Sequence, residues 1–272
     1  MTRIKTSEGL ILNVATYNLH KGLSLFNKRV IVDEVREHLH NLAPDLVFLQ
    51  EVQGSHTAHA TRFENWPKHG HHDHIATDRW HHTAYGANAK YDAGHHGNAL
   101  LSTHPILRWK NHDVSHHRFE NRGHLHTSIA VPGLAQPLHT VCVHLGLLAA
   151  SRNAQITSLI RQLKRKMKLD APLIIAGDFN DWRGEKSGIS ERLEGELGLQ
   201  DAFAVTHGNT AATFPAFMPM LKLDRVYVRG FKVETAERLA NNSTHKHWQH
   251  LSDHAGLLVQ LRAEKAMLGD AD

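Results

Sequence analysis

The sequence predicts a mixed fold of the α/β or α+β class, in one domain. Short apolar runs typical of buried strands alternate with segments of helical spacing through most of the 272 residues. Hydrophobic residues make up 41% of the chain, which is enough for one sizeable core. No internal repeat, low-complexity linker or Pro/Gly-rich boundary interrupts this pattern. We therefore expect a single domain over 1–272, with a core of 10–263 and a frayed tail at 264–272.

The predicted strands are short apolar runs, and several of them end directly in polar residues. In chain order they are 10–17, 46–49, 99–101, 125–131, 138–145, 172–177, 223–228 and 256–261. Apolar residues at helical spacing predict helices over 30–41, which Pro44 closes, over 151–167, where Ser151 is a candidate N-cap, and over 189–197.

The composition favours a soluble protein. The net charge is +4 with histidine neutral and the pI is about 9.2, which suits a polyanionic substrate without requiring one. Cys142 is the only cysteine, so no intramolecular disulfide can form and a reducing compartment is favoured. The first residues lack a secretory h-region, and no run approaches ~18 apolar residues. We expect a cytoplasmic protein, and a monomer.

Polar side chains repeatedly follow the predicted strands. Asn18, Glu51, His144, Asp178 and Asn180 all stand at or just beyond a strand's carboxyl end. Ligands of open α/β sheets gather at such ends, so these side chains can converge on one site. The alternative for each residue alone is an ordinary polar turn.

Asp178 and Asn180 form the sharpest local pattern. In an extended segment residues i and i+2 point the same way, so both would face one substrate while Phe179 turns into the core. A carboxylate can orient or deprotonate water, and an amide can donate to a phosphoryl oxygen. The alternative is an Asx-turn after Gly177.

Three further acidic positions extend this interpretation. Glu51 is a hard oxygen ligand of the kind Mg²⁺ accepts, although it could instead cap a helix. Asp253 and His254 are adjacent, so one can reach a metal while the other reaches the scissile group; the alternative is a surface turn. Asp224 lies in a strand-like run and is expected to bind His254 and fix its tautomer, unless it pairs with Arg225.

Two compositional features have less specific interpretations. Sixteen of the 26 histidines lie between His56 and His126, which suggests either transition-metal binding or a polar loop surface. A basic run along the predicted helix 151–167 could follow a nucleic-acid backbone or an anionic membrane, or could be a solvated helix face. Its members are Arg161, Lys164, Arg165, Lys166 and Lys168.

Together these residues form motifs that resemble the endonuclease/exonuclease/phosphatase family, whose fold is DNase I-like. The motifs occur in the family's order: TYN at 16–18, LQEV at 49–52, GNALLS at 97–102, VHL at 143–145, GDFN at 177–180, LDR at 223–225 and SDH at 252–254. Three longer stretches are similar to a group of small bacterial members: ENWP at 64–67, GHHGNA at 94–99 and GDFNDWR at 177–183.

The resemblance implies a four-layer α/β sandwich, in which two packed mixed β-sheets are flanked by helices, and it implies Mg²⁺ or Mn²⁺ as cofactor. It assigns Glu51 and Asn18 to the metal, with Asp253 close by. It makes Asp178 and Asn180 the residues that orient water and contact phosphate, and His144 a phosphate contact or acid. The pair of His254 and Asp224 becomes the central acid/base or transition-state stabiliser. We further assign four residues to substrate binding: His20, Asn98, Arg122 and Arg152.

The resemblance leaves the substrate open. His20 stands where the DNA-repair branch carries an acidic residue, and no Pro-Asn pair follows His144, which argues against abasic-site repair. The expected activity is in-line attack of water on a phosphoester, with phosphodiesterase or nuclease action foremost. The alternatives are a sphingomyelinase-like phosphodiesterase or phosphatase acting on an anionic lipid headgroup or a small phosphoester, and a non-catalytic histidine-rich protein that binds metal or nucleic acid.

Overall fold

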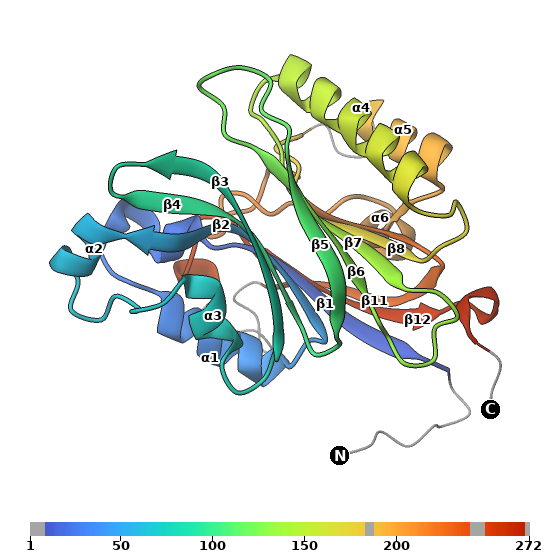
Figure 1. The fold of residues 1–272 in the computed structure, drawn as a ribbon, viewed down its shortest axis with the longest axis horizontal. Helices are drawn as coiled ribbons and strands as arrows, with labels where there is room; N and C mark the ends of the chain where they lie inside the picture. The colour runs from blue at the N-terminus through green and yellow to red at the C-terminus, as the bar shows by residue number, and fades with distance from the viewer. Residues whose placement is uncertain (1–8, 183–187, 240–247, 270–272) are drawn as a thin grey trace.

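The computed structural model describes residues 9–182, 188–239 and 248–269. Two six-stranded β-sheets pack face to face and carry helices on their outer surfaces (Figure 1). The predicted four-layer sandwich of two mixed sheets flanked by helices is confirmed. Arg183, the last residue of the GDFNDWR stretch, lies outside the described residues.

The first sheet has the order β11-β12-β1-β2-β4-β3. Its strands are β1 (Ile11–Asn18), β2 (Leu46–His56), β3 (His82–Tyr91), β4 (Gly94–Ser102), β11 (Phe231–Leu239) and β12 (Gly256–Ala263). The second sheet has the order β5-β6-β7-β8-β10-β9. Its strands are β5 (Ile106–Asp113), β6 (Gly123–Ile129), β7 (Leu138–His144), β8 (Leu173–Asp178), β9 (Gln200–Asp201) and β10 (Asp224–Arg229).

Alternation of apolar side chains divides the interior into layers. Along β1, Leu12 and Val14 enter the core between the sheets, whereas Ala15 and Tyr17 face the opposite side. That outer face lies under α1 (Val32–Leu42) and α3 (His71–Ala76), and α2 (Thr57–Arg62) follows β2. The outer face of the second sheet packs against α4 (Ala149–Lys166) and α5 (Gly188–Leu197), while α6 (Ala202–His207) follows β9. Figure 1 shows α1 and α3 on one side of the stacked sheets and α4 and α5 on the other.

The strands predicted from apolar runs all appear, and three of them, β2, β4 and β12, are longer than predicted. The strands that were missed include β3, β5 and β11, which lie at sheet edges. Edge strands bury fewer side chains, so they lack a continuous apolar run; β5, for example, is mostly exposed. The prediction of Ser151 as an N-cap is wrong, because α4 begins at Ala149 and Ser151 is buried in its first turn.

The start of the segment expected to fray is held against the fold. Lys265–Met267 form a short 3₁₀-helix. The backbone N–H of Ala135 donates to the Met267 carbonyl at 2.9 Å, and that of Gly269 donates to the Gly133 carbonyl at 3.1 Å. The described part of this segment therefore makes backbone hydrogen bonds to the rest of the fold.

Candidate active site

Two parallel strand pairs, one near the middle of each sheet, bring the polar strand ends together. In the first sheet β1 and β2 are parallel, so Asn18 lies beside Gln50 and next to Glu51. In the second sheet β7 and β8 are parallel, and His144 lies beside Asp178. Because the sheets pack face to face, the carboxyl ends of these pairs meet, as expected for polar residues that follow parallel strands.

Asp178 stands at the centre of this cluster. Its Oδ2 accepts a hydrogen bond from the Asn18 amide of the other sheet at 3.2 Å. The same oxygen lies 3.5 Å from Nε2 of His144 and 3.9 Å from Nε2 of His254. One buried carboxylate oxygen therefore connects residues from β1, β7 and the segment before β12.

Burial raises the pKa of Asp178 to about 7, and the neighbouring charge of Asp224 adds to the increase, although the charge of His254 opposes it. Its Oδ1 accepts from the backbone N–H of Asn180 at 2.8 Å, so the Asx-turn is present. Asn180 has a left-handed φ of 50°, and the expected extended geometry is therefore wrong. Phe179 is fully buried as predicted, and Asn180 donates its amide to the Leu145 carbonyl at 2.9 Å.

The register of β10 against β8 places Asp224 directly opposite Asp178. Asp224 Oδ2 accepts from His254 Nδ1 at 2.8 Å and from the Thr213 hydroxyl at 2.6 Å. Burial alone would lower the pKa of His254, but the charges of Asp224 and Asp178 outweigh it and raise the pKa to about 10. The expected Asp224–His254 contact is present, whereas Arg225 pairs with Asp181 instead.

His144 has the opposite electrostatic character. It is buried, and this burial, together with the positive charge of Arg122, lowers its pKa well below the usual value. A neutral imidazole beside Asp178 can donate a hydrogen bond but is not a strong acid. Of the two roles expected for His144, phosphate contact therefore fits the structure better.

A bulge in β2 sets the direction of Glu51. The pairing of β2 with β4 shifts register between Leu49 and Val52, and Glu51 takes a left-handed φ of 51°. A bulge of this kind redirects a side chain out of the regular alternation. The Glu51 carboxylate lies 3.7 Å from the Lys21 ammonium, and Asp253 lies 3.3 Å from Nδ1 of His20.

These groups fit a divalent cation. Carboxylate and amide oxygens are the donors that Mg²⁺ and Mn²⁺ prefer. Burial is the largest cause of the raised pKa of Asp178, and the negative charges of Asp224 and Glu51 raise it further. Negative charge is therefore concentrated at this place, where a cation would offset it. Asn18 Oδ1 accepts from the His20 backbone N–H at 3.1 Å and keeps a second lone pair.

A second set of donors is Asp178, Asp224 and His254, whose ligand atoms lie within 4.8 Å of one another. Two observations weaken this set as a metal site. Nδ1 of His254 is occupied by Asp224, and the raised pKa keeps the ring protonated. A protonated imidazole has no lone pair for a metal, so the geometry favours the side of the site that holds Glu51.

The four residues assigned to substrate binding occupy different environments. His20 lies at the site beside Asp253. Arg122 binds the Leu145 carbonyl through Nε at 3.0 Å and remains partly exposed near His144. Asn98 is buried and donates to the carbonyls of Gly123 and Cys142. Arg152 is buried and donates to the carbonyls of Gly146 and Leu147, so it supports the loop before α4; its contact with substrate stays a prediction.

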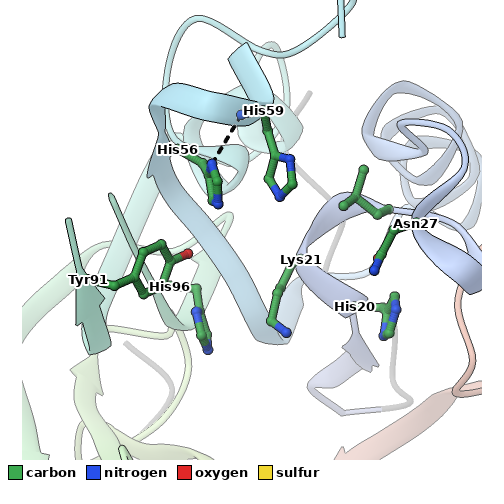
Figure 2. Close-up of a pocket in the computed structure, with 8 residues that line it drawn as sticks. His20, Lys21, Asn27, His56, His59, Tyr91 and His96 are labelled. Atoms are coloured by element: carbon green, nitrogen blue, oxygen red, sulfur yellow. Dashed lines mark hydrogen bonds between the residues drawn. The ribbon is translucent and has the colours of Figure 1, made fainter. Parts of the chain in front are cut away.

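The histidines of the 56–126 segment are spread over the core, one cavity and the surface. His71 and His124 are fully buried. His56, His59 and His96 line a cavity together with Lys21 and other residues (Figure 2). No three metal ligands from 56–126, a segment described throughout, come together in the structure. The five basic residues of the run from Arg161 to Lys168 are exposed, and Lys164 pairs with Glu196 of α5.

Sequence reasoning missed three residues that support the site. Thr213 holds Asp224, and Lys21 contacts Glu51. Buried Gln50 donates to Thr16 and to the Cys142 sulfur of the other sheet. Of these three, only Gln50 could have been found from a local sequence pattern, because it is a polar residue at the end of an apolar run. Thr213 and Lys21 reach the site through the course of loops, which no local pattern specifies.

Comparisons with known proteins agree with the fold. The model of the endonuclease/exonuclease/phosphatase family matches residues 15–254. The chain is 40% identical over 248 residues to the uncharacterized protein YbhP of Escherichia coli K12, covering 91% of this chain and 95% of YbhP. An endonuclease/exonuclease/phosphatase structure from Beutenbergia cavernae has a TM-score of 0.70 at 18% identity, covering 93% of this chain and 72% of that one. The human Nocturnin catalytic domain with bound sulfate has a TM-score of 0.71 at 16% identity, and the match covers 93% of this chain and 94% of that domain.

Among the described helices, none has the length and apolar character to cross a bilayer.

Proposed function

Because the chain belongs to the endonuclease/exonuclease/phosphatase family, we propose that it is a divalent-metal-dependent hydrolase that cleaves phosphodiesters by in-line attack of water. Members of this family generally use divalent metals and act on phosphoesters. The observation that carries the proposal is that Nε2 of His144 and Nε2 of His254 both lie within 3.9 Å of one carboxylate oxygen, Oδ2 of Asp178. These side chains come from distant parts of the chain and serve no evident packing purpose.

Asp178 orients and deprotonates the attacking water. A general base works best when its pKa lies near the working pH, and burial raises the pKa of Asp178 to about 7. The Asn180 backbone N–H and the Asn18 amide hold the two carboxylate oxygens. The water oxygen then attacks phosphorus opposite the leaving oxygen, and the proton of the water passes to Asp178. The bond between phosphorus and the leaving oxygen breaks, and the leaving group departs with the electron pair as an oxyanion that takes a proton from solvent.

His254 stabilises the charge that develops on the phosphoryl oxygens. Asp224 holds the imidazole in place and keeps it protonated, so Nε2–H points toward Asp178 and the reacting group. His144 adds a neutral donor. Preorganised donors of this kind are usually the largest single contribution to such catalysis.

Mg²⁺ or Mn²⁺ is the proposed cofactor, held by Glu51 with Asn18 and Asp253 nearby. When bound, it supplies a Lewis acid that neutralises charge on a phosphoryl oxygen. The bulge in β2 presents Glu51 to this position, and Lys21 balances its charge.

A panel of phosphoesters tests the proposal. Wild-type protein should hydrolyse bis-p-nitrophenyl phosphate with Mg²⁺ or Mn²⁺ and lose the activity with EDTA. His254→Ala should lower turnover by a factor on the order of 10²–10³. Supercoiled DNA, RNA, phospholipid and p-nitrophenyl phosphate identify the substrate class. No turnover of any phosphoester, or full activity in His254→Ala, would contradict the proposal.

A lipid headgroup is the second candidate substrate, favoured by apolar side chains around the site. Leu147 and Leu148 are 66% and 60% exposed in the loop that follows β7, and Trp182 is 54% exposed after β8. Exposed apolar residues clustered at one place mark an interaction surface. If this surface binds lipid, phospholipid vesicles should raise turnover, and Leu147→Ser with Leu148→Ser should abolish that increase while leaving hydrolysis of bis-p-nitrophenyl phosphate unchanged.

A further inference from the structure

A cavity of about 300 Å³ opens beside the candidate active site. Its walls come from the 3₁₀ segment after β1, the junction of β2 with α2, and the β3–β4 hairpin (Figure 2). Two wall residues also contact the site: Lys21 lies 3.7 Å from Glu51, and His20 lies 3.3 Å from Asp253. A substrate held at the site can therefore extend into this cavity.

The described residues that line the cavity include no acidic side chain. They include the Lys21 ammonium, the Asn27 amide and four imidazoles. His56 Nδ1 accepts the backbone N–H of His59 at 3.1 Å, so the neutral His56 ring carries its proton on Nε2. The cavity thus offers hydrogen-bond donors and a positive charge, which is the chemistry that recognises an anion.

The rings of His56 and His59 turn their edges, rather than their faces, toward the cavity. The ring centroids are 3.6 Å apart and the rings stack on each other. Figure 2 shows both rings pointing from one wall toward Lys21. Stacking uses the facing π-surfaces, and the nitrogens lie at the edges. This arrangement suits phosphate oxygens better than a planar base, which needs an open ring face.

We propose that this cavity binds a second phosphate group carried by the same substrate molecule, next to the phosphoester that is cleaved. The proposal rests on the proposed hydrolase function and narrows its substrate class. The second phosphate can belong to a nucleotide chain or to a phosphorylated lipid headgroup. Lys21, His56 and His59 are the residues that would select it.

The test compares two substrates that differ by one phosphate: thymidine 5′-(p-nitrophenyl phosphate) with and without a 3′-phosphate. Wild-type kcat/KM should be about tenfold or more higher with the 3′-phosphate, which corresponds to ~1.4 kcal/mol. His56→Asn keeps an acceptor for the His59 N–H but moves the donor. It should raise KM for the bisphosphate about tenfold while leaving kcat, and the single-phosphate substrate, within about twofold.

Lys21→Gln is the second variant, and it should also raise KM for the bisphosphate more than for the single phosphate. His81→Asn is the matched control, because His81 is exposed and lies outside the cavity lining. This variant should change KM for neither the bisphosphate nor the single-phosphate substrate. A second pair of substrates is a glycerophosphodiester with and without a second phosphate. A preference for the bisphosphate in either pair supports the proposal and shows whether the second phosphate belongs to a nucleotide or to a lipid headgroup.

Equal hydrolysis of both substrates in both pairs overturns the proposal. So does a rise in KM that is equal for the bisphosphate and the single-phosphate substrate in both variants. Absence of hydrolysis in both pairs would instead refute the hydrolase function, and this proposal with it.

Discussion

Replacing Asp224 by Asn should remove most of the turnover without weakening metal binding. Asp224 is 1% exposed and accepts from Nδ1 of His254 at 2.8 Å. Its charge is the main factor that raises the pKa of His254 against the effect of burial. Without that charge, burial favours a neutral, less well oriented imidazole at neutral pH. One charged donor to the developing phosphoryl charge is then lost, which costs on the order of 10²–10³ in kcat, or about 3–4 kcal/mol.

The assay is steady-state hydrolysis of bis-p-nitrophenyl phosphate over a range of Mg²⁺ and Mn²⁺ concentrations. The half-saturating metal concentration should stay within about twofold of wild type, since Asp224 lies on the histidine side of the site. Asp201→Asn is the matched control. Asp201 is also a carboxylate of the second sheet, but it caps α6 through Phe203 and Ala204, so this variant should keep full turnover. Wild-type kcat in Asp224→Asn would refute the role of this pair.

Three further predictions concern the metal, pH and the backbone. Glu51→Gln should raise the half-saturating metal concentration by about 10–100-fold, measured by activity and by calorimetric titration; unchanged metal affinity would contradict the assignment. Burial lowers the pKa of His124 to about 3, whereas a histidine of the unfolded chain titrates near 6.5. Between these two pH values the unfolded state binds one proton more than the folded state. The free energy of unfolding therefore decreases by ~1.4 kcal/mol for each pH unit that the pH falls through this range. His124→Leu should therefore reduce the acid dependence of the urea midpoint, whereas His81→Gln should not; equal slopes in all three proteins would exclude this contribution. Gly177→Ala should lower the free energy of unfolding by more than about 1 kcal/mol and reduce activity. The φ of Gly177 is +141°, and a Cβ at this position would lie 2.0 Å from the Val143 carbonyl oxygen. A variant with the wild-type Tm would contradict this prediction.

The buried half of the fold could be predicted from sequence, because central strands are continuous apolar runs. Residues 46–49 and 172–177 are examples, and the polar residues that end them identified Glu51 and Asp178. The edge strands could not be predicted in this way. β5 and β3 have exposed faces, and their positions depend on pairing with distant strands rather than on their own composition.

The candidate site was predicted as a set of residues, but its geometry was not. Two features decide that geometry: the left-handed φ values of Glu51 and Asn180, and the register that sets Asp224 opposite Asp178. A left-handed residue is not recognisable from a Glu or Asn in isolation. Thr213 holds Asp224 across a loop, and such a long-range contact leaves no periodic trace in the sequence.

The most direct measurement is the position of Mn²⁺ in crystals of the protein soaked with that ion, located by its anomalous scattering. The account predicts one strong peak in direct coordination distance of the Glu51 carboxylate, about 2.0–2.3 Å away, with the Asp224–His254 hydrogen bond intact. A peak coordinated by His254 and Asp224, or no peak near Glu51 at saturating Mn²⁺, would contradict it.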